Sequence, residues 1–416
     1  MKKLIVASCL ACSLLGGVRA ELLPVPADWP SPTTNLPPLL KTFAGKEVKD
    51  RATWEKVRAP EVRKFFLENM YGRRPAEAER PPVSFANEGA DKVMMDGTAL
   101  RKRVRVTSKG PFGEHTFTFT AFIPTAAKGP VPAFLLICNR DPNENIDPER
   151  VQRTEFWPAE EIVARGYAAL AFWNADVAPD YIVHGKSKRM IPEQNFHYGV
   201  YPAFERCNAR DDASWATLSA WAWGASRVMD WIETEPKLDA RKVAVVGHSR
   251  GGKTSLVAGV TDPRFAMACV NDSGCGGAKL ANIDLPDSEH YSAFLRSRAI
   301  HWFCGNFEKR FVGLDGEHPS VYDRKAGLWP LKVDQHAWAA LMAPRLLAVA
   351  SASEDDWAGQ PGEYWTCRLA SPAWELYGVK GLAPGGNVHY HLRKGIHNLT
   401  LEDWNAYMDF AAAHGW

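Results

Sequence analysis

The chain has 416 residues, of which 46% are hydrophobic and 24% are charged, and its 50 basic residues nearly balance its 48 acidic ones. This composition is that of a globular protein, long enough for one large domain or two smaller ones. The balanced charge excludes the strongly basic class of proteins that bind nucleic acid or anionic membranes.

Residues 1–20 are predicted to form a secretory signal peptide. Two lysines precede an apolar stretch, and Val18-Arg19-Ala20 forms a small-x-small cleavage site before Glu21. A buried N-terminal helix is the alternative interpretation. Since no later segment is long and apolar enough to cross a membrane, we expect a mature protein that is secreted, either periplasmic or extracellular.

The first half of the mature chain is predicted to begin with a proline-rich arm and a helix. The arm covers 21–45 and the helix 50–71. Strand patterns follow at 99–107, 115–124, 131–138 and 167–173, with a helix at 158–165 between the last two.

The second half alternates apolar strands with helices. We predict strands at 242–248, 266–271, 345–351 and 387–393, and helices at 251–261, 362–377 and 400–414. Continuous apolar strands separated by helices indicate a mostly parallel sheet that is covered on both faces.

Two irregular stretches, 175–212 and 276–335, interrupt this pattern and are expected to lie over the carboxyl ends of the strands, where α/β folds bind ligands. Because no linker or repeat divides the chain, we predict a single catalytic domain over 21–416. Six cysteines would remain after cleavage. Their pairing cannot be deduced from spacing, and without a Cys-x-x-Cys or His-x-x-x-His cluster we expect no zinc site. We also expect no cofactor.

Residues 247–251 read Gly-His-Ser-Arg-Gly and lie between an apolar strand and a helix. This matches Gly-x-Ser-x-Gly in the strand-to-helix context that a nucleophilic serine requires. Glycines on both sides allow a tight turn, which would project the Ser249 hydroxyl above the sheet. The backbone N–H after the serine could then bind a developing oxyanion.

A serine nucleophile needs a histidine base and an acid that orients it, and in this context they follow the serine in the order acid, then histidine. Four histidines lie late in the chain. His389 and His391 alternate within a predicted strand, whereas His397 lies in a glycine-containing loop after that strand. We therefore predict that His397 is the base.

Two carboxylates are candidates for the acid. Asp355 follows the strand 345–351, at the usual position of the acid, and Asp272 ends the strand that comes after the nucleophile helix. A solvated loop or a helix cap is the alternative interpretation of each.

The motifs around these residues resemble the bacterial glucuronoyl esterases, carbohydrate esterase family 15. The resemblance rests on Gly-His-Ser-Arg-Gly-Gly-Lys at 247–253, Asp-Ser-Gly-Cys-Gly-Gly-Ala at 272–278, His-Trp-Phe at 301–303 and the helix segment 65–73. It covers roughly residues 55–400 and implies an α/β-hydrolase fold, with inserted loops around the active site. It also implies hydrolysis of esters between glucuronic acid, often 4-O-methylated, and lignin alcohols, without a metal.

The resemblance assigns roles to further residues. Arg250, directly after the serine, would add a charged donor to the oxyanion hole, and Lys253 would contact sugar hydroxyls. The alternative interpretation is that Arg250 and Lys253 are solvated cations in the first turn of a helix. Positive charge at that position is opposed by the helix dipole, which favours a functional role. Glu289 is the nearest equivalent of a family glutamate that binds a sugar hydroxyl. Trp357 would lie against the sugar ring, or alternatively be a core tryptophan.

Members of the family place the acid at either of two positions, and this chain has an aspartate at both. We favour Asp355 over Asp272 because it occupies the ordinary acid position of the fold. The stretch 287–290, Asp-Ser-Glu-His, departs from the family's Gly-Glu, and the stretch 302–340 is longer than the family spacing.

The resulting prediction is a secreted serine esterase of glucuronoxylan or of lignin–carbohydrate esters, working as a monomer without nucleic acid or membrane partners. The alternatives are another carbohydrate esterase, such as an acetyl-xylan esterase, or a catalytically silent polysaccharide-binding relative.

Overall fold

The computed structural model describes residues 27–32, 36–180, 183–184, 189–190, 192–283, 285–296, 299–312 and 332–416. The predicted signal peptide, part of the proline-rich arm and about half of the segment 302–340 that exceeds the family spacing lie outside these residues. Among the described residues, no helix combines the length and apolarity needed to cross a membrane.

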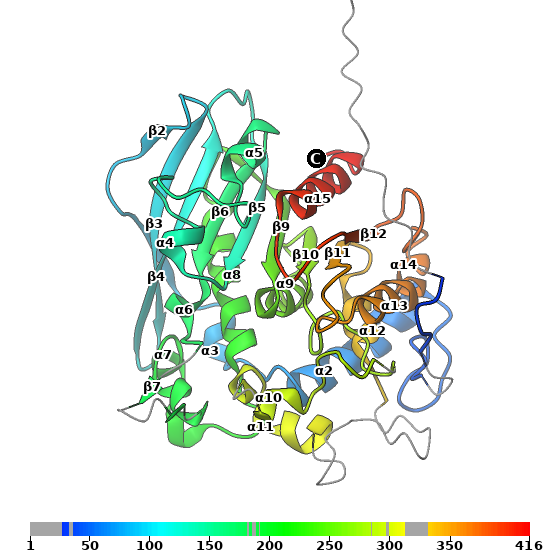
Figure 1. Ribbon diagram of the computed structural model, residues 1–416. Coiled ribbons are helices and arrows are strands. Elements are labelled where there is room, and N and C mark those ends of the chain that lie inside the picture. Colours follow the sequence, from blue (N-terminus) through cyan, green and yellow to red (C-terminus); the bar gives the residue numbers. More distant parts are fainter. Residues whose placement is uncertain are drawn as a thin grey trace, which may run out of the picture.

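A ten-stranded sheet is the centre of the molecule (Figure 1). Its order is β1-β3-β4-β6-β5-β9-β10-β11-β12, and β2 pairs with β3 outside this path. The strands are β1 Val83–Asn87, β2 Lys92–Met94, β3 Ala99–Gly110, β4 Gly113–Pro124, β5 Val131–Cys138, β6 Ala168–Trp173, β9 Leu238–His248, β10 Met267–Asn271, β11 Leu346–Ala352 and β12 Val388–Arg393, while β7 Val183–His184 and β8 Arg189–Met190 form a separate hairpin.

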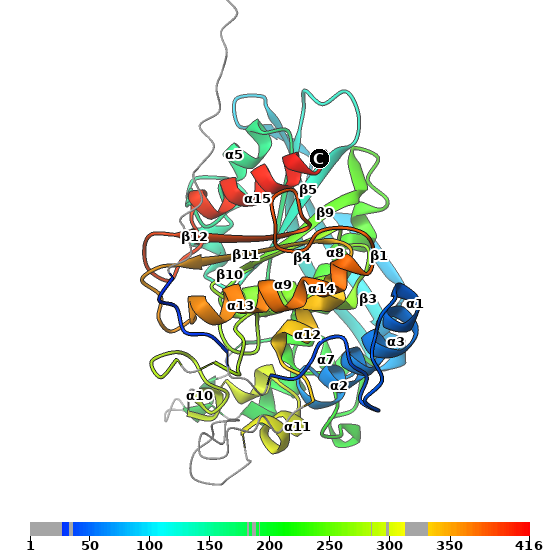
Figure 2. The same cartoon turned by 90° about the vertical axis from the view of Figure 1, so that its right-hand side faces the viewer.

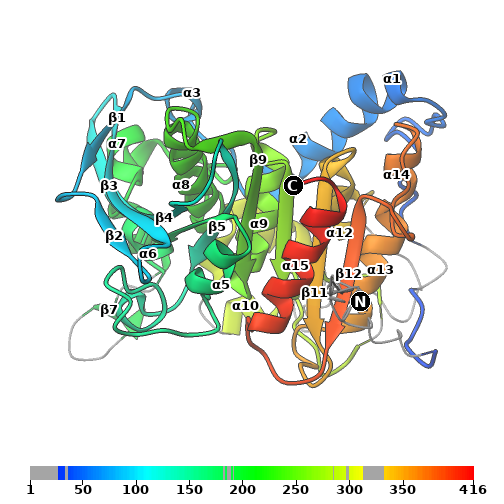
Figure 3. The same ribbon diagram turned by 90° about the horizontal axis from the view of Figure 1, so that it is seen from above.

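The sheet has a parallel half and an antiparallel half. From β6 to β12 every neighbouring pair is parallel. The pairs β1–β3, β2–β3, β3–β4 and β4–β6 are antiparallel. Seen from above, the antiparallel strands lie together at one end of the sheet and β12 lies at the other (Figure 3). The predicted mostly parallel sheet is therefore present.

Helices cover both faces of the sheet. The α-helices are α1 Arg51–Thr53, α2 Ala59–Asn69, α3 Ala76–Glu79, α4 Pro142–Asn145, α5 Ala159–Ala164, α6 Asn174–Val177, α7 Tyr201–Phe204, α8 Thr217–Ile232, α9 Arg250–Thr261, α10 Ala293–Arg296, α11 Gly305–Phe307, α12 Gln335–Ala339, α13 Gln360–Ala370, α14 Pro372–Glu375 and α15 Leu401–Ala413. A π-helical turn, Trp54–Arg58, joins α1 to α2, so the predicted helix 50–71 is one helical segment. The predicted helix 362–377 is divided at Pro372, because proline has no N–H to donate to the preceding turn.

Alternate residues of each parallel strand point to opposite faces, which divides the core into two layers. In β5, Leu135 packs in the layer that contains α8, α9 and α13, whereas Phe134 packs in the layer that contains α5 and α15. Figure 2 shows α15 on one side of the strands and α9 and α13 on the other. Burial on both faces explains why these strands are continuously apolar.

The described part of the proline-rich arm is attached to the body by buried polar groups. The ring of His336, on α12, donates its Nε2–H to the carbonyl oxygen of Pro37 at 3.1 Å. Arg58 donates from Nε to the carbonyl oxygen of Leu39 at 2.9 Å. Burial lowers the pKa of His336 to about 4, so the ring is neutral in the folded protein.

This buried histidine should make stability depend on pH. Because the unfolded chain takes up a proton near its usual pKa of about 6.5 and the folded chain does not, stability falls as pH drops from there toward 4. We expect the unfolding free energy of the wild type to fall by about 2 kcal/mol more than that of His336→Gln between about pH 7.5 and pH 5. Urea denaturation at the two pH values measures this, and parallel profiles would show that the ring is not held neutral.

Candidate active site

The chain turns sharply at Ser249, between β9 and α9. This residue has φ +56° and ψ −124°, a backbone conformation that L-residues rarely adopt. A Cβ atom at Gly247 would lie 2.0 Å from the carbonyl oxygen of Gly251, so only glycine fits there. The turn therefore needs the glycine pattern of the motif, and it presents the half-buried serine at the carboxyl edge of the sheet.

Backbone donors lie beside this serine. Its own N–H donates to the carbonyl oxygen of Asn271 at 2.9 Å, which ties the turn to the end of β10. The next N–H groups belong to the first turn of α9 and have no acceptor within the helix. They and the helix dipole favour negative charge at this position.

His397 lies next to the turn. Its Nδ1 is 2.5 Å from Oδ2 of Asp355, and the centre of its ring is 4.4 Å from the ring of His248, the residue before Ser249. The side chain is 39% exposed, whereas that of Asp355 is 4% exposed. The carboxylate fixes the proton on Nδ1, which leaves Nε2 to exchange a proton with a substrate.

His248 contributes to the support of the turn. Its Nδ1–H donates to Oδ1 of Asn271 at 2.6 Å, and the side chain is fully enclosed. Burial, followed by the neighbouring His397, keeps the pKa of His248 well below its usual range. It is therefore a neutral structural imidazole.

Asp272, the other acid candidate, also lies close to the base. One oxygen each of Asp272 and Asp355 and a ring nitrogen of His397 are within 4.8 Å of one another. The Oδ1 atom of Asp272 accepts from the N–H of Ala352 at 2.8 Å. Its Oδ2 lies 3.4 Å from the Arg393 guanidinium, so its polar contacts go to the backbone and to a cation rather than to the base.

Burial raises the pKa of Asp272 well above its usual range, and the nearby carboxylates Glu363, Asp355 and Asp403 act in the same direction. Three groups so close together could ligate a divalent cation, but the guanidinium of Arg393 already compensates the charge of Asp272. The absence of a metal in the reaction stays a prediction.

The Arg250 side chain is held at the carboxyl end of the sheet by two contacts. Its Nε lies 2.5 Å from Oδ2 of Asp180, and its Nη2 donates to the carbonyl oxygen of Asn139 at 2.9 Å. Asp180 also accepts from the indole N–H of Trp302 at 2.8 Å. A pocket of about 740 Å³, lined by Arg250, Asp180 and residues that follow β5 and β6, opens beside this guanidinium.

Lys253 and Glu289 are brought together. The Nζ atom of Lys253 lies 2.7 Å from Oε2 of Glu289 and donates to the carbonyl oxygen of Ser273 at 2.5 Å. Both side chains are largely buried, at 3% and 11% exposed. The N–H of Glu289 donates to the carbonyl oxygen of Trp357 at 2.7 Å, and Trp357 is 52% exposed, so it is not a core residue.

Three residues of this region were not singled out from the sequence. Asp180 lies in the irregular stretch 175–212, Arg393 ends β12, and Glu363 lies on α13. Glu363 is fully buried and accepts from the N–H and hydroxyl of Ser273 at 2.7 and 2.6 Å. Of these three residues, only Arg393 could have been noticed in the sequence, because it is a charged residue at the end of an apolar strand.

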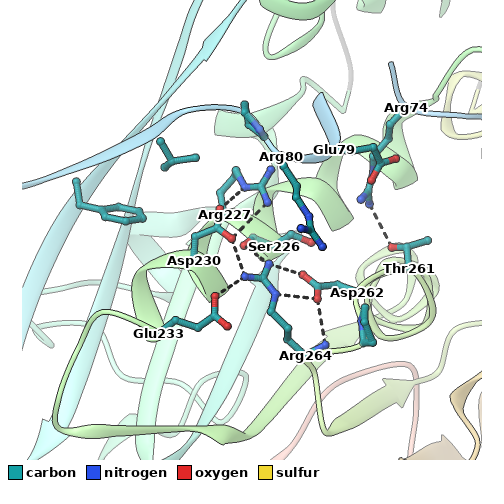
Figure 4. Close-up of a pocket in the computed structure, with 14 residues that line it drawn as sticks. Arg74, Glu79, Arg80, Ser226, Arg227, Asp230, Glu233, Thr261, Asp262 and Arg264 are labelled. Atoms are coloured by element: carbon teal, nitrogen blue, oxygen red, sulfur yellow. Dashed lines mark hydrogen bonds and ion pairs between the residues drawn. The ribbon is translucent and has the colours of Figure 1, made fainter. Parts of the chain in front are cut away.

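A second large pocket, of about 600 Å³, lies at the opposite end of α9 (Figure 4). Arg264 crosses it and pairs with Asp230 at 2.8 Å, Glu233 at 2.7 Å and Asp262 at 2.7 Å. The twelve residues of α9 separate it from Ser249 by about 18 Å. Its lining cations are matched by carboxylates, so it is an ion-pair network rather than part of the candidate site.

Comparisons with known proteins identify similar chains. A family model described as glucuronyl esterase, fungi, matches residues 106–378. Carbohydrate esterase MZ0003, from an unknown prokaryotic organism, is 30% identical over 92% of this chain and 90% of its own length. A 4-O-methyl-glucuronoyl methylesterase of Sodiomyces alcalophilus is 29% identical over 58% of this chain, and the match spans 45% of that fungal protein.

Solved structures give the same result. A glucuronoyl esterase from Solibacter usitatus superposes with a TM-score of 0.77 and 31% identity, covering 94% of this chain and all of that one. A glucuronoyl esterase from Teredinibacter turnerae superposes with a TM-score of 0.75 and 25% identity, covering 92% and 90%. The predicted α/β-hydrolase fold is thereby confirmed.

Proposed function

The chain belongs to the glucuronoyl esterases, carbohydrate esterase family 15, and from this membership we propose that it hydrolyses esters between 4-O-methyl-glucuronic or glucuronic acid and lignin alcohols through an acyl-enzyme on Ser249. It is a serine carboxylic-ester hydrolase. The observation that carries the proposal is the 2.5 Å contact between His397 and Asp355 beside the Ser249 turn.

In this proposal His397 removes the proton of Ser249 as the hydroxyl attacks the ester carbonyl. Asp355 holds the imidazole in the tautomer with a proton on Nδ1 and stabilises the imidazolium that forms. His397 then protonates the leaving alcohol, and water, activated by the same imidazole, releases the uronate from the acyl-enzyme.

The oxyanion is stabilised in this proposal by the backbone N–H and the guanidinium of Arg250. The pairs with Asp180 and Asn139 fix the side chain before a substrate binds, so little reorganisation is needed during the reaction. Each oxyanion donor should lower the barrier by about 3 kcal/mol.

The sugar is proposed to contact Lys253, Glu289 and Trp357. The buried pair of Lys253 and Glu289 offers charged donors and acceptors to hydroxyl groups. The exposed ring of Trp357 offers an apolar face to a sugar ring, and its carbonyl group connects it directly to Glu289.

A kinetic comparison of methyl glucuronate, methyl galacturonate and acetylated xylan tests the function. We expect kcat/KM to be highest on methyl glucuronate, and Arg250→Ala to lower it there by about 100-fold. The guanidinium acts at the carbonyl, so its loss should appear in kcat. A preference of the wild type for the acetyl ester would instead identify an acetyl-xylan esterase, and failure on all three would favour a silent binding protein.

We also propose that the mature protein, residues 21–416, is exported, acts as a monomeric single-domain enzyme and needs no cofactor. The predicted signal sequence at residues 1–20 and the plant cell-wall nature of the proposed substrate support export.

A further inference from the structure

We propose that Arg393 is a positioning residue that clamps the loop carrying His397 and so keeps the imidazole in line with Ser249. This inference rests on the proposed role of His397 as the base. The clamp is defined by three buried side chains, Arg393, Asp272 and Asp403.

The guanidinium holds the loop through its carbonyl groups. The Nη2 atom of Arg393 donates to the carbonyl oxygens of Ile396 at 2.9 Å and Asn398 at 2.5 Å, the residues on either side of His397. Nη1 donates to the carbonyl oxygen of Lys394 at 3.4 Å. One planar group thus fixes the backbone before and after the base.

The guanidinium is itself anchored on the opposite side. Its Nε donates to Oδ2 of Asp403 at 2.7 Å. The same oxygen accepts from the N–H and the hydroxyl of Thr400, both at 2.9 Å, at the start of α15. The last helix and the end of β12 are therefore joined through one cation.

Asp272 completes the clamp from the end of β10. Its Oδ2 lies 3.4 Å from Nη2 of Arg393 and accepts from the N–H of Asn398 at 3.3 Å. The side chains of Arg393, Asp272 and Asp403 are 3%, 0% and 0% exposed. A charge so deeply buried is stable only with its partners, so the three groups form one unit.

Outside the clamp, the loop is held by the contact between His397 and Asp355 and by the N–H of Glu354, which donates to the carbonyl oxygen of Gly395 at 2.8 Å. Ile396 is 68% exposed and the His397 side chain is 39% exposed, so apolar packing contributes little. Gly395 has φ +125°, and a Cβ atom there would lie 3.0 Å from Nη1 of Arg393. The loop is therefore shaped closely around the guanidinium.

Only arginine suits this position. Its planar fork donates in several fixed directions, whereas a lysine ammonium on a flexible stem cannot reach the carbonyl groups on both sides of His397 and Asp403 at once. Arg393→Lys keeps the buried positive charge but loses the planar set of donors. The variant therefore distinguishes a role in positioning the loop from a role in compensating the buried carboxylates.

The test compares Arg393→Lys with the matched control Arg345→Lys. Arg345 also donates to carbonyl oxygens, those of Gly259 and Phe265, both at 2.7 Å, but at the amino edge of the sheet. The measurements are the rate at which a fluorophosphonate probe labels Ser249, kcat and KM on methyl glucuronate, and the melting temperature.

We expect Arg393→Lys to slow labelling and lower kcat by about 10- to 100-fold with KM little changed, because a displaced base costs rate rather than binding. Arg345→Lys should lower the melting temperature by a similar amount and leave both rates unchanged. Wild-type rates in Arg393→Lys, with only a lower melting temperature, would overturn the proposal.

A second variant covers the case in which Arg393→Lys does not fold. Asp403→Asn has the same shape, keeps an acceptor for Thr400 and weakens the anchor of the guanidinium. It should slow labelling severalfold, and unchanged labelling would likewise overturn the clamp. Because labelling needs no sugar, slow turnover of methyl glucuronate by a wild type that labels rapidly would contradict the proposed substrate and not the clamp.

Discussion

Ser249→Ala is expected to reduce kcat on methyl or benzyl glucuronate by about 10⁵- to 10⁶-fold, because the variant has no nucleophile to form the acyl-enzyme. Alanine meets the same backbone strain at φ +56° as serine does, so the fold should persist. Steady-state kinetics and probe labelling measure the loss, and the melting temperature checks the fold.

Ser255→Ala is the matched control for this change. Ser255 lies on the same helix, α9, and its buried hydroxyl lies within hydrogen-bond distance of the carbonyl oxygens of Gly252 and Cys269, at 2.9 and 2.8 Å. It should keep the activity of the wild type. Comparable activity in Ser249→Ala would mean that another group attacks the ester.

Asp355→Asn is expected to lower kcat by about 10³- to 10⁴-fold, because an amide cannot hold the His397 tautomer or stabilise the imidazolium. Asp272→Asn should cost about tenfold, since its carboxylate contacts the loop and Arg393 rather than the imidazole. The two isosteric variants therefore distinguish the two acid candidates by the size of the loss in kcat.

The reverse order of losses would identify Asp272 as the residue that orients the base. Equal, small losses in both variants would mean that the acid lies elsewhere. Melting temperatures are needed beside the rates, because Asp272 is fully buried and its replacement also weakens the ion pair with Arg393.

The parallel half of the sheet could be predicted because strands buried on both faces leave long apolar runs such as those of β5 and β9. Helix α8 was not predicted from the sequence. It is apolar or buried on nearly every side, so its sequence shows no polar stripe at helical spacing. The short strands β1 and β2 contain no buried residue and are mostly exposed, so neither a long apolar run nor a clear apolar–polar alternation marks them in the sequence.

The position of Ser249 and His397 could be predicted because each follows the end of a strand, and parallel strands end at one edge. Contacts between segments that are distant in the sequence could not be predicted. Asp180 meets Arg250, and Glu289 meets Lys253, only through the folding of long irregular stretches. Arg393 could be read from the sequence as a strand-end cation, but its carbonyl partners depend on the course of the backbone.

The connection between β12, its loop and α15 has a consequence for biogenesis. In the proposed clamp, the loop that carries the imidazole is fixed only once α15 has docked, because Asp403 then receives the guanidinium of Arg393. A chain whose α15 has not yet packed would carry the serine but lack a positioned base, so it should not cleave an ester. Hydrolytic competence should thus follow the docking of α15.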